Sequence, residues 1–182
     1  MEERISNILI VGGGAVSGAL ARKFAQYSDA EEIYIASSSN IKSDFYKNID
    51  IREDDLTSLL KFVIDNNISL TIPVSNSALS SDIVSFFESN GQNVFAPPKR
   101  ACDLMLNELS CKKFLYKMRA QTSKFGIYNK PQMAYDFLKQ ANFPVIISSA
   151  LPSGLLGDDK LIAATMSQAV RFTDELFINK SE

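Results

Sequence analysis

The amino-acid sequence predicts a layered α/β domain with a parallel sheet, followed by a smaller α+β domain. Two observations predict this. In the first half of the 182 residues, apolar runs of strand length alternate with amphipathic stretches of helix length. At Ala96-Pro97-Pro98 the alternation stops, because two prolines end a strand and stiffen a linker. We therefore expect one domain over residues 1–96 and a second over residues 97–182.

The strands of the first domain are predicted from continuous apolar runs, because strands of a parallel sheet are covered on both faces. These runs are Asn7–Val11, Glu32–Ala36, Ser69–Pro73 and Asn93–Phe95. Helices are predicted where apolar residues recur every three or four positions. They are Ser17–Tyr27, Asp55–Asn66 and Leu79–Ser89. Strand and helix alternating in this way imply right-handed crossovers and a Rossmann-like, three-layer domain.

The second half has a less regular pattern. Helices are predicted at Lys99–Leu106, Glu108–Arg119, Pro131–Gln140 and Met166–Phe177, and the first two could form one kinked helix. Pro131 suits the first turn of its helix. Strands are predicted at Lys124–Tyr128, Pro144–Ser148 and Lys160–Ala164, and a Gly/Asp loop at Ser153–Asp159.

Composition excludes several classes of function. The 19 basic and 21 acidic residues give a net charge of −2, too weak a positive field to hold nucleic acid. The chain has no histidine, which removes His-based triads and His-ligated metal sites. Cys102 and Cys111 fit no metal spacing and indicate reduced thiols. No apolar run reaches the ~20 residues of a membrane span. We expect a cytoplasmic protein without metal, nucleic-acid or membrane binding.

A glycine loop follows the first predicted strand and opens the first helix. Such a loop lets the backbone approach a phosphate, with helix amides as donors. Its spacing is G-x-G-x-x-x-G, with Ser17 where a dinucleotide site has its third glycine, and no acidic residue follows the second strand. This disfavours NAD. Contact with a single phosphate and a purely structural turn stay open as interpretations. The candidate ligand contacts are Gly12, Gly13, Gly14, Ser17 and Gly18.

Polar residues elsewhere add weaker candidates. Ser75, Asn76 and Ser77 follow the Ser69–Pro73 strand at its carboxyl end, where layered α/β sheets bind ligands. Lys99 lies at the domain boundary. It is a candidate contact for a cofactor phosphate, and the alternative is an ordinary surface lysine. We interpret Asp54-Asp55 as a helix N-cap rather than a metal pair. The basic cluster Lys112-Lys113, Lys117 and Arg119 is typical of a solvated helix face.

Four motifs of the first half occur in a recognisable order. The first is the glycine loop, with Gly12, Gly14 and Ala19-Leu20-Ala21; its residues Val16-Ser17-Gly18 depart from the Arg-Glu-His of the motif that it resembles. The others are Ile33-Tyr34-Ile35-Ala36, Val74-Ser75-Asn76 followed by Ala78–Ile83, and Phe95–Ala101. They resemble glycinamide ribonucleotide synthetase, also called phosphoribosylamine–glycine ligase, an enzyme of purine synthesis. Its corresponding motifs are G-x-G-G-R-E-H-A, V-Y-V-A, G-P-E and F-G-P-T-K-x-A.

The resemblance continues through the second half. The family's L-E-G-S-K falls on Leu104–Glu108, its P-x-V-V-K-A-D-G on Pro144–Leu151 and its G-K-G on Leu155–Gly157. It implies that the first half binds phosphoribosylamine and that the second half opens an ATP-grasp fold. In that fold lysines hold ATP phosphates, and later carboxylates hold magnesium. The resemblance places these lysines where this sequence has Ser148 and Leu156, which cannot supply the positive charge that phosphoryl transfer needs. The lysine of the family's Ser-Lys step is Glu108 here, which reverses the sign of the charge.

Family members are more than twice this length. By the resemblance, we expect a truncated, degenerate relative of the ligase that keeps a phosphate or small-ligand pocket but does not ligate glycine alone. We assign no catalytic residue. The cofactor stays open, because the resemblance implies ATP and magnesium and the lysine losses argue against them. Two alternatives are a split ligase, with a protein partner supplying the missing ATP-grasp half, and a generic nucleotide-binding Rossmann module.

Overall fold

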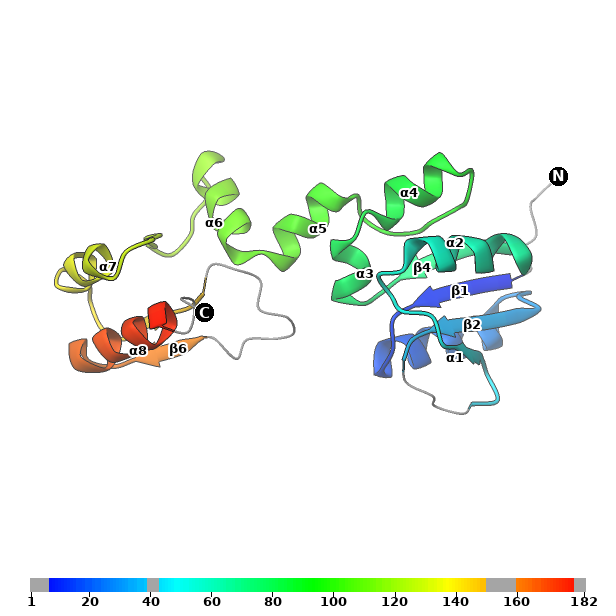
Figure 1. Ribbon diagram of the computed structural model, residues 1–182, viewed down its shortest axis with the longest axis horizontal. Helices are drawn as coiled ribbons and strands as arrows, with labels where there is room; N and C mark the ends of the chain where they lie inside the picture. The colour runs from blue at the N-terminus through cyan, green and yellow to red at the C-terminus, as the bar shows by residue number, and fades with distance from the viewer. Residues whose placement is uncertain (1–6, 39–42, 150–159, 179–182) are drawn as a thin grey trace. The chain divides into compact units, whose positions relative to one another are not determined.

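The computed structural model describes residues 7–38, 43–149 and 160–178 (Figure 1). The chain divides into two compact units, Met1–Asp103 and Leu104–Glu182. Helix α5 (Lys99–Leu106) spans the boundary between them.

The first unit is built on a four-stranded sheet with the order β3-β2-β1-β4. Every neighbouring pair is parallel, and Ile8 of β1 lies opposite Ile33 of β2 and Leu70 of β4. The strands are β1 (Asn7–Val11), β2 (Glu32–Ala36), β3 (Lys47–Ile49) and β4 (Ile68–Pro73). The predicted parallel α/β architecture is confirmed.

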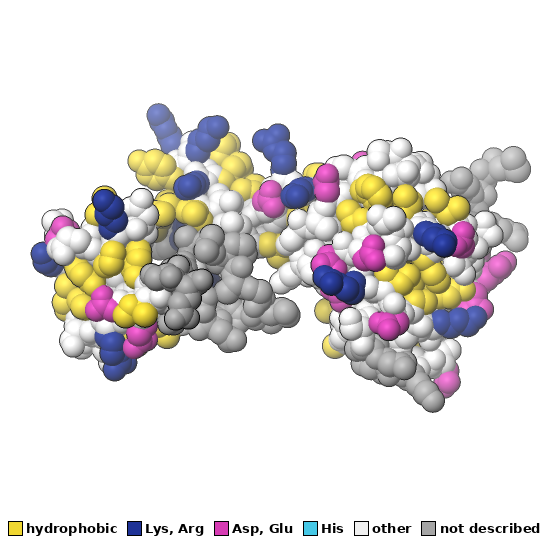
Figure 2. Space-filling view, in the orientation of Figure 1, with side chains coloured by type: hydrophobic (Ala, Val, Ile, Leu, Met, Phe, Trp, Pro, Cys, Tyr) yellow, Lys and Arg dark blue, Asp and Glu magenta, His cyan; other side chains and the backbone are white. Residues whose placement is uncertain are grey.

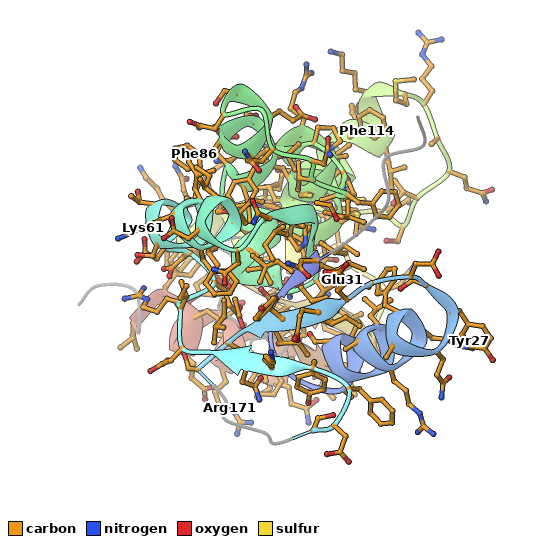
Figure 3. The ribbon with its side chains drawn as sticks, turned by 90° about the vertical axis from the view of Figure 1, so that its right-hand side faces the viewer. Tyr27, Glu31, Lys61, Phe86, Phe114 and Arg171 are labelled. Carbon is orange, nitrogen blue, oxygen red and sulfur yellow. The ribbon has the colours of Figure 1, made fainter. Side chains whose placement is uncertain are left out.

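Helices cover both faces of this sheet, which explains why β1 is apolar throughout. Leu9 and Val11 pack with α2 (Leu56–Asp65) and α4 (Ile83–Ser89) on one face. Ile8 and Ile10 point to the other face and pack with α1 (Ala15–Tyr27). Figure 3 shows Lys61 of α2 and Tyr27 of α1 pointing outward on opposite sides of the sheet. The result is a three-layer domain with two core clusters.

The second unit is smaller. Strands β5 (Val145–Ile147) and β6 (Leu161–Ala163) form an antiparallel pair. On one face, Ala163 packs with residues of α7 (Pro131–Leu138) and α8 (Met166–Ile178). On the other face, the facing residues Ile146 and Ile162 are 68% and 69% exposed. Helix α6 (Glu108–Lys117) has no buried residue.

Three sequence predictions for individual elements are wrong. The helix expected over Leu79–Ser89 is two short helices, α3 (Asn76–Ser80) and α4, because Ser81 is extended and its hydroxyl bonds the Ala78 carbonyl at 2.6 Å. Asn93–Phe95 forms only a single bridge, Thr71 to Val94, since the prolines that follow cannot extend a ladder. Lys124–Tyr128 forms no strand, because it lies beside no strand of the described second-unit sheet.

Two further expectations about elements can be judged. The stretch from Lys99 to Arg119 is two helices rather than one, and Asn107 caps the second by accepting the Ser110 amide at 3.0 Å. Asp55 is the N-cap of α2 and accepts the Ser58 amide at 3.1 Å, as predicted. Strand β3 was not predicted, because its sequence Lys-Asn-Ile has no apolar run. The predicted loop Ser153–Asp159 lies outside the described residues.

Replacing Thr71 by valine is expected to stabilise the first unit. Thr71 is fully buried in β4, and its hydroxyl oxygen has no hydrogen-bond partner within the described residues. Valine keeps the shape and removes the unsatisfied group, so Thr71→Val should raise the unfolding free energy by about 1 kcal/mol. Urea unfolding measures this. The control Thr71→Ser keeps the hydroxyl and loses a methyl group, so it should destabilise; a destabilised Thr71→Val would contradict the prediction.

The Asp55 cap should make stability depend on pH. Hydrogen bonds from Ser58 lower the pKa of Asp55 below its usual value. A lowered folded-state pKa stabilises above the unfolded value of about 3.9, and this contribution disappears as pH falls through the folded pKa. Asp55→Ala should therefore lower the melting temperature more at pH 7 than at pH 2.5. Asp55→Asn keeps a capping oxygen and should lose less at pH 7. An equal loss from Asp55→Ala at both pH values would argue against the cap.

Candidate functional site

The carboxyl ends of the parallel strands bring several loops to one edge of the first unit. The Gly12 amide donates to the Ala36 carbonyl of β2 at 2.9 Å, and the Val74 amide donates to the Val11 carbonyl of β1 at 2.9 Å. The sheet pairing therefore continues one residue beyond β1 and β4. This places the glycine loop (residues 12–14) beside the serine turn (residues 75–77).

Gly12 allows the two segments to meet. Its φ is +131°, a conformation that side chains rarely adopt. A Cβ at this position would lie 2.8 Å from the Ser75 Cβ and 2.9 Å from the Ser75 nitrogen. Glycine is thus required here both for the backbone conformation and for space. The sequence predicted candidates in both segments, and the structure places them side by side.

The other loop residues differ in their surroundings. Ser17 is fully buried, and its hydroxyl donates to the Gly12 carbonyl at 2.5 Å, so it braces the loop from inside. Gly18 lies within the first turns of α1 and donates to the Gly14 carbonyl at 3.2 Å. Gly14 is the N-cap of α1 with φ +93°, and a Cβ there would meet nothing within 4 Å. The loop is therefore closed at Gly12 and open to space at Gly14.

The serine turn is organised by its own hydroxyls. Ser75 caps α3, accepting the Ala78 amide at 3.2 Å, and its Oγ lies 3.1 Å from the Ser77 Oγ. Asn76 is exposed. Lys99 is also exposed, at the start of α5, and the described contacts do not join it to the glycine loop or the serine turn. Of the predicted residues of this edge, Gly12, Gly13, Ser75 and Ser77 come together.

Glu53 is the residue of this edge that the sequence did not reveal. One carboxylate oxygen accepts the Gly13 amide at 3.1 Å, and the other accepts a short hydrogen bond from the Ser77 hydroxyl. Glu53 follows β3, so its loop reaches the same edge as those of β1 and β4. Recognising Lys47–Ile49 as a parallel strand would have placed Glu53 there. The edge thus joins a glycine-loop amide, a carboxylate and two hydroxyls.

Metal binding gains no support from this edge. Within the described residues, no three Asp, Glu or Cys side chains gather in a way that could hold an ion. Arg52 binds the Asp54 carboxylate through two hydrogen bonds, of 3.0 and 2.6 Å. The bond from Arg52 lowers the pKa of Asp54. The three acidic residues at 53–55 therefore have separate roles: Glu53 contacts the glycine loop, Asp54 forms an ion pair and Asp55 caps a helix.

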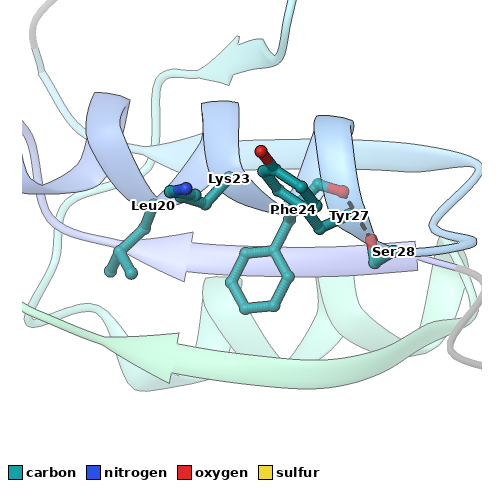
Figure 4. Close-up of a pocket in the computed structure, with 5 residues that line it drawn as sticks. All are labelled: Leu20, Lys23, Phe24, Tyr27 and Ser28. Atoms are coloured by element: carbon teal, nitrogen blue, oxygen red, sulfur yellow. Dashed lines mark hydrogen bonds between the residues drawn. The ribbon is translucent and has the colours of Figure 1, made fainter.

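A hollow elsewhere on the first unit does not involve these residues. Its volume is about 400 Å³ (Figure 4). It is lined by Leu20, Lys23, Phe24 and Tyr27 of α1 and by Ser28, the C-cap of that helix. Lys23 lies over the Tyr27 ring, with its nitrogen 4.5 Å from the ring centre. All five residues come from a single helix and its cap, so the hollow offers no converging set of polar groups.

The second unit shows what replaces the family's lysines. Ser148 is exposed directly after β5. Glu108 is the first residue of α6, and its carboxylate pairs with Lys160 at 2.7 Å. Leu156 lies outside the described residues. Figure 2 shows Lys and Arg side chains gathered over α6, where Lys112 donates to the Thr122 and Ser123 hydroxyls at 3.0 and 2.7 Å.

No helix of the described residues is long and apolar enough to cross a membrane.

Comparison with known proteins gives a consistent result. Residues 6–104 match the family model "Phosphoribosylglycinamide synthetase, N domain". The phosphoribosylamine–glycine ligase of Fusobacterium nucleatum is 30% identical over 177 residues, which are 95% of this chain and 40% of that protein. The enzyme of Halalkalibacterium halodurans is 27% identical over 171 residues, 93% of this chain and 39% of that protein. The chain thus spans about two fifths of the length of these relatives.

Solved structures share the fold. Phosphoribosylglycinamide synthetase from Anaerococcus prevotii gives a TM-score of 0.62 at 14% identity, covering 93% of this chain and 42% of that one. N5-carboxyaminoimidazole ribonucleotide synthetase from Thermus thermophilus gives 0.66 at 16% identity, covering 90% and 42%. The fold is that of the domain that precedes ATP-grasp, with the beginning of the next domain. With its first unit matched by the family model, the chain belongs to the phosphoribosylglycinamide synthetase family.

Proposed function

We propose that this relative of the purine-biosynthetic ligases binds a small phosphorylated sugar at the glycine-loop edge of its first unit, and that it does not ligate glycine by itself. The contact between Gly12 and Ser75 carries the proposal. It holds an open helix N-terminus at Gly14 beside hydroxyls and a carboxylate, the groups that recognise a phosphate and a sugar.

The residues of the second unit do not fit the phosphates of ATP. Phosphoryl transfer depends on positive charges placed around the transferred group. Ser148 has no charge, and Glu108 carries a negative charge that Lys160 already pairs. The described residues also gather no acidic group for magnesium. Ser148 and Glu108 therefore offer no positive charge to ATP.

A split ligase is the second candidate function. Similarity to the curated ligases extends over 93–95% of this chain, and so into the second unit, as expected of a working part of a larger assembly. In that case a partner polypeptide would supply the ATP-grasp portion to which this chain has no counterpart. Mixing this chain with a polypeptide matching that portion should then produce glycine ligation that neither has alone.

A thermal-shift series should show ribose 5-phosphate raising the melting temperature of the chain, whereas ATP and NAD leave it unchanged. Ligand at about 100 times its Kd adds about 2.7 kcal/mol to stability, enough for a shift of several degrees. Stabilisation by ATP would contradict the argument from Ser148 and Glu108. Stabilisation by NAD alone would favour a generic dinucleotide-binding module.

Gly12→Ala should abolish this shift. The added methyl group would lie 2.8 Å from the Ser75 Cβ at a φ of +131°, so the loop must move away from the serine turn. Gly91→Ala is the matched control, because Gly91 also has a positive φ, of +70°, but lies in a turn after α4 with open space around it. Both variants should be less stable than the parent chain, and only Gly12→Ala should lose the response. An unchanged response to ribose 5-phosphate in Gly12→Ala would place the ligand elsewhere.

A further inference from the structure

The hydrogen bonds around Glu53 engage the hydroxyl protons of both serines of the serine turn. Ser77 donates its only proton to Glu53. The Ser75 hydroxyl, 3.1 Å from the Ser77 Oγ, must then donate its own proton to Ser77. The Gly13 amide donates to the other Glu53 oxygen at 3.1 Å. Three donors that could have bound an anion are thus directed toward one carboxylate: the Gly13 amide and the Ser77 hydroxyl directly, and the Ser75 hydroxyl through Ser77.

Charge acts in the same direction. Asp50, Glu53, Asp54 and Asp55 lie in six consecutive residues that contain one cation, Arg52, and Arg52 is already paired with Asp54. A phosphate approaching the Gly13 amide would meet the Glu53 carboxylate, which already accepts that amide. The two negative charges would repel each other, and more strongly where water is partly excluded.

The same carboxylate remains able to accept hydrogen bonds. Two carboxylate oxygens offer about four acceptor positions, and Gly13 and Ser77 occupy two of them. Glu53 is partly exposed, and the space beside Gly14 is open. Hydroxyl or amine groups of a ligand can therefore reach Glu53, whereas the donors left for a phosphate are those at Gly14, the start of α1 and the exposed Asn76 side chain.

We propose that Glu53 is the specificity-determining residue of this edge: it binds the hydroxyl or amine groups of a sugar ligand and excludes phosphate from the Gly13 amide and the Ser75 and Ser77 hydroxyls. This rests on the proposed function, since it assigns the parts of the same ligand to different places. The ligand class is a sugar phosphate whose recognition depends on its sugar, and inorganic phosphate alone is a poor ligand.

The test measures two ligands on Glu53→Gln, which removes the charge and keeps the shape. Inorganic phosphate should bind Glu53→Gln about tenfold more tightly than the parent chain, and ribose 5-phosphate about tenfold more weakly. Calorimetry gives both constants, and the Gly13 amide resonance reports where phosphate binds. Asp65→Asn, with the same charge change on an exposed side chain at the far end of α2, should leave both constants within about twofold. Ser77→Ala keeps the carboxylate and should gain no phosphate affinity.

The outcomes separate the two proposals. Opposite changes of the two ligands in Glu53→Gln support the inference. Changes in the same direction, no change, or equal changes in Asp65→Asn overturn it, as does phosphate binding to the parent chain at the Gly13 amide. Failure of ribose 5-phosphate to bind the parent chain would refute the proposed function. The effect of Glu53→Gln on inorganic phosphate would still decide whether Glu53 excludes phosphate.

Discussion

Burial of β1 on both faces is the constraint on which the first unit depends. Ile8, Leu9, Ile10 and Val11 are all fully buried, and they alternate between two separate core clusters. A strand in this position needs parallel neighbours on both sides and helices above and below. Its carboxyl end then fixes Gly12 at the edge of the sheet. The approach of the glycine loop to the serine turn follows from where this strand ends.

The edge itself is a polar network centred on Glu53, Ser75 and Ser77. Ser17 holds the loop from inside through the Gly12 carbonyl, and Glu53 holds it from outside through the Gly13 amide. A loop braced on both sides loses little conformational entropy when it binds a ligand, which is the general advantage of preorganisation. Under the proposed function, the same bracing determines which chemical groups a ligand must bring, and specificity then arises from acceptors and negative charge more than from a positive field.

The second unit combines an apolar core with surface ion pairs. Ala163, with Val145 and Ile147 beside it, builds a core with α7 and α8. Glu108, where the resemblance implied a lysine, is one half of an ion pair with Lys160. Apolar packing depends on shape and tolerates many sequences, whereas holding a triphosphate requires particular charges. Structural similarity to these synthetases therefore reflects the shared fold and not the charges that a triphosphate needs.

Patterns local to the sequence were enough for the buried elements. Continuous apolar runs located β1 and β2, helical spacing located α1 and α2, and Asp55 was recognisable as a cap because a cap acts within one turn. The tertiary structure decided what local patterns do not contain: the edge strand β3, the break at Ser81, and the meeting of Glu53 with Gly13 and Ser77 across 40 and 24 positions of sequence. An edge strand needs no apolar run, and a hydrogen bond between distant residues depends on where the strands end in space.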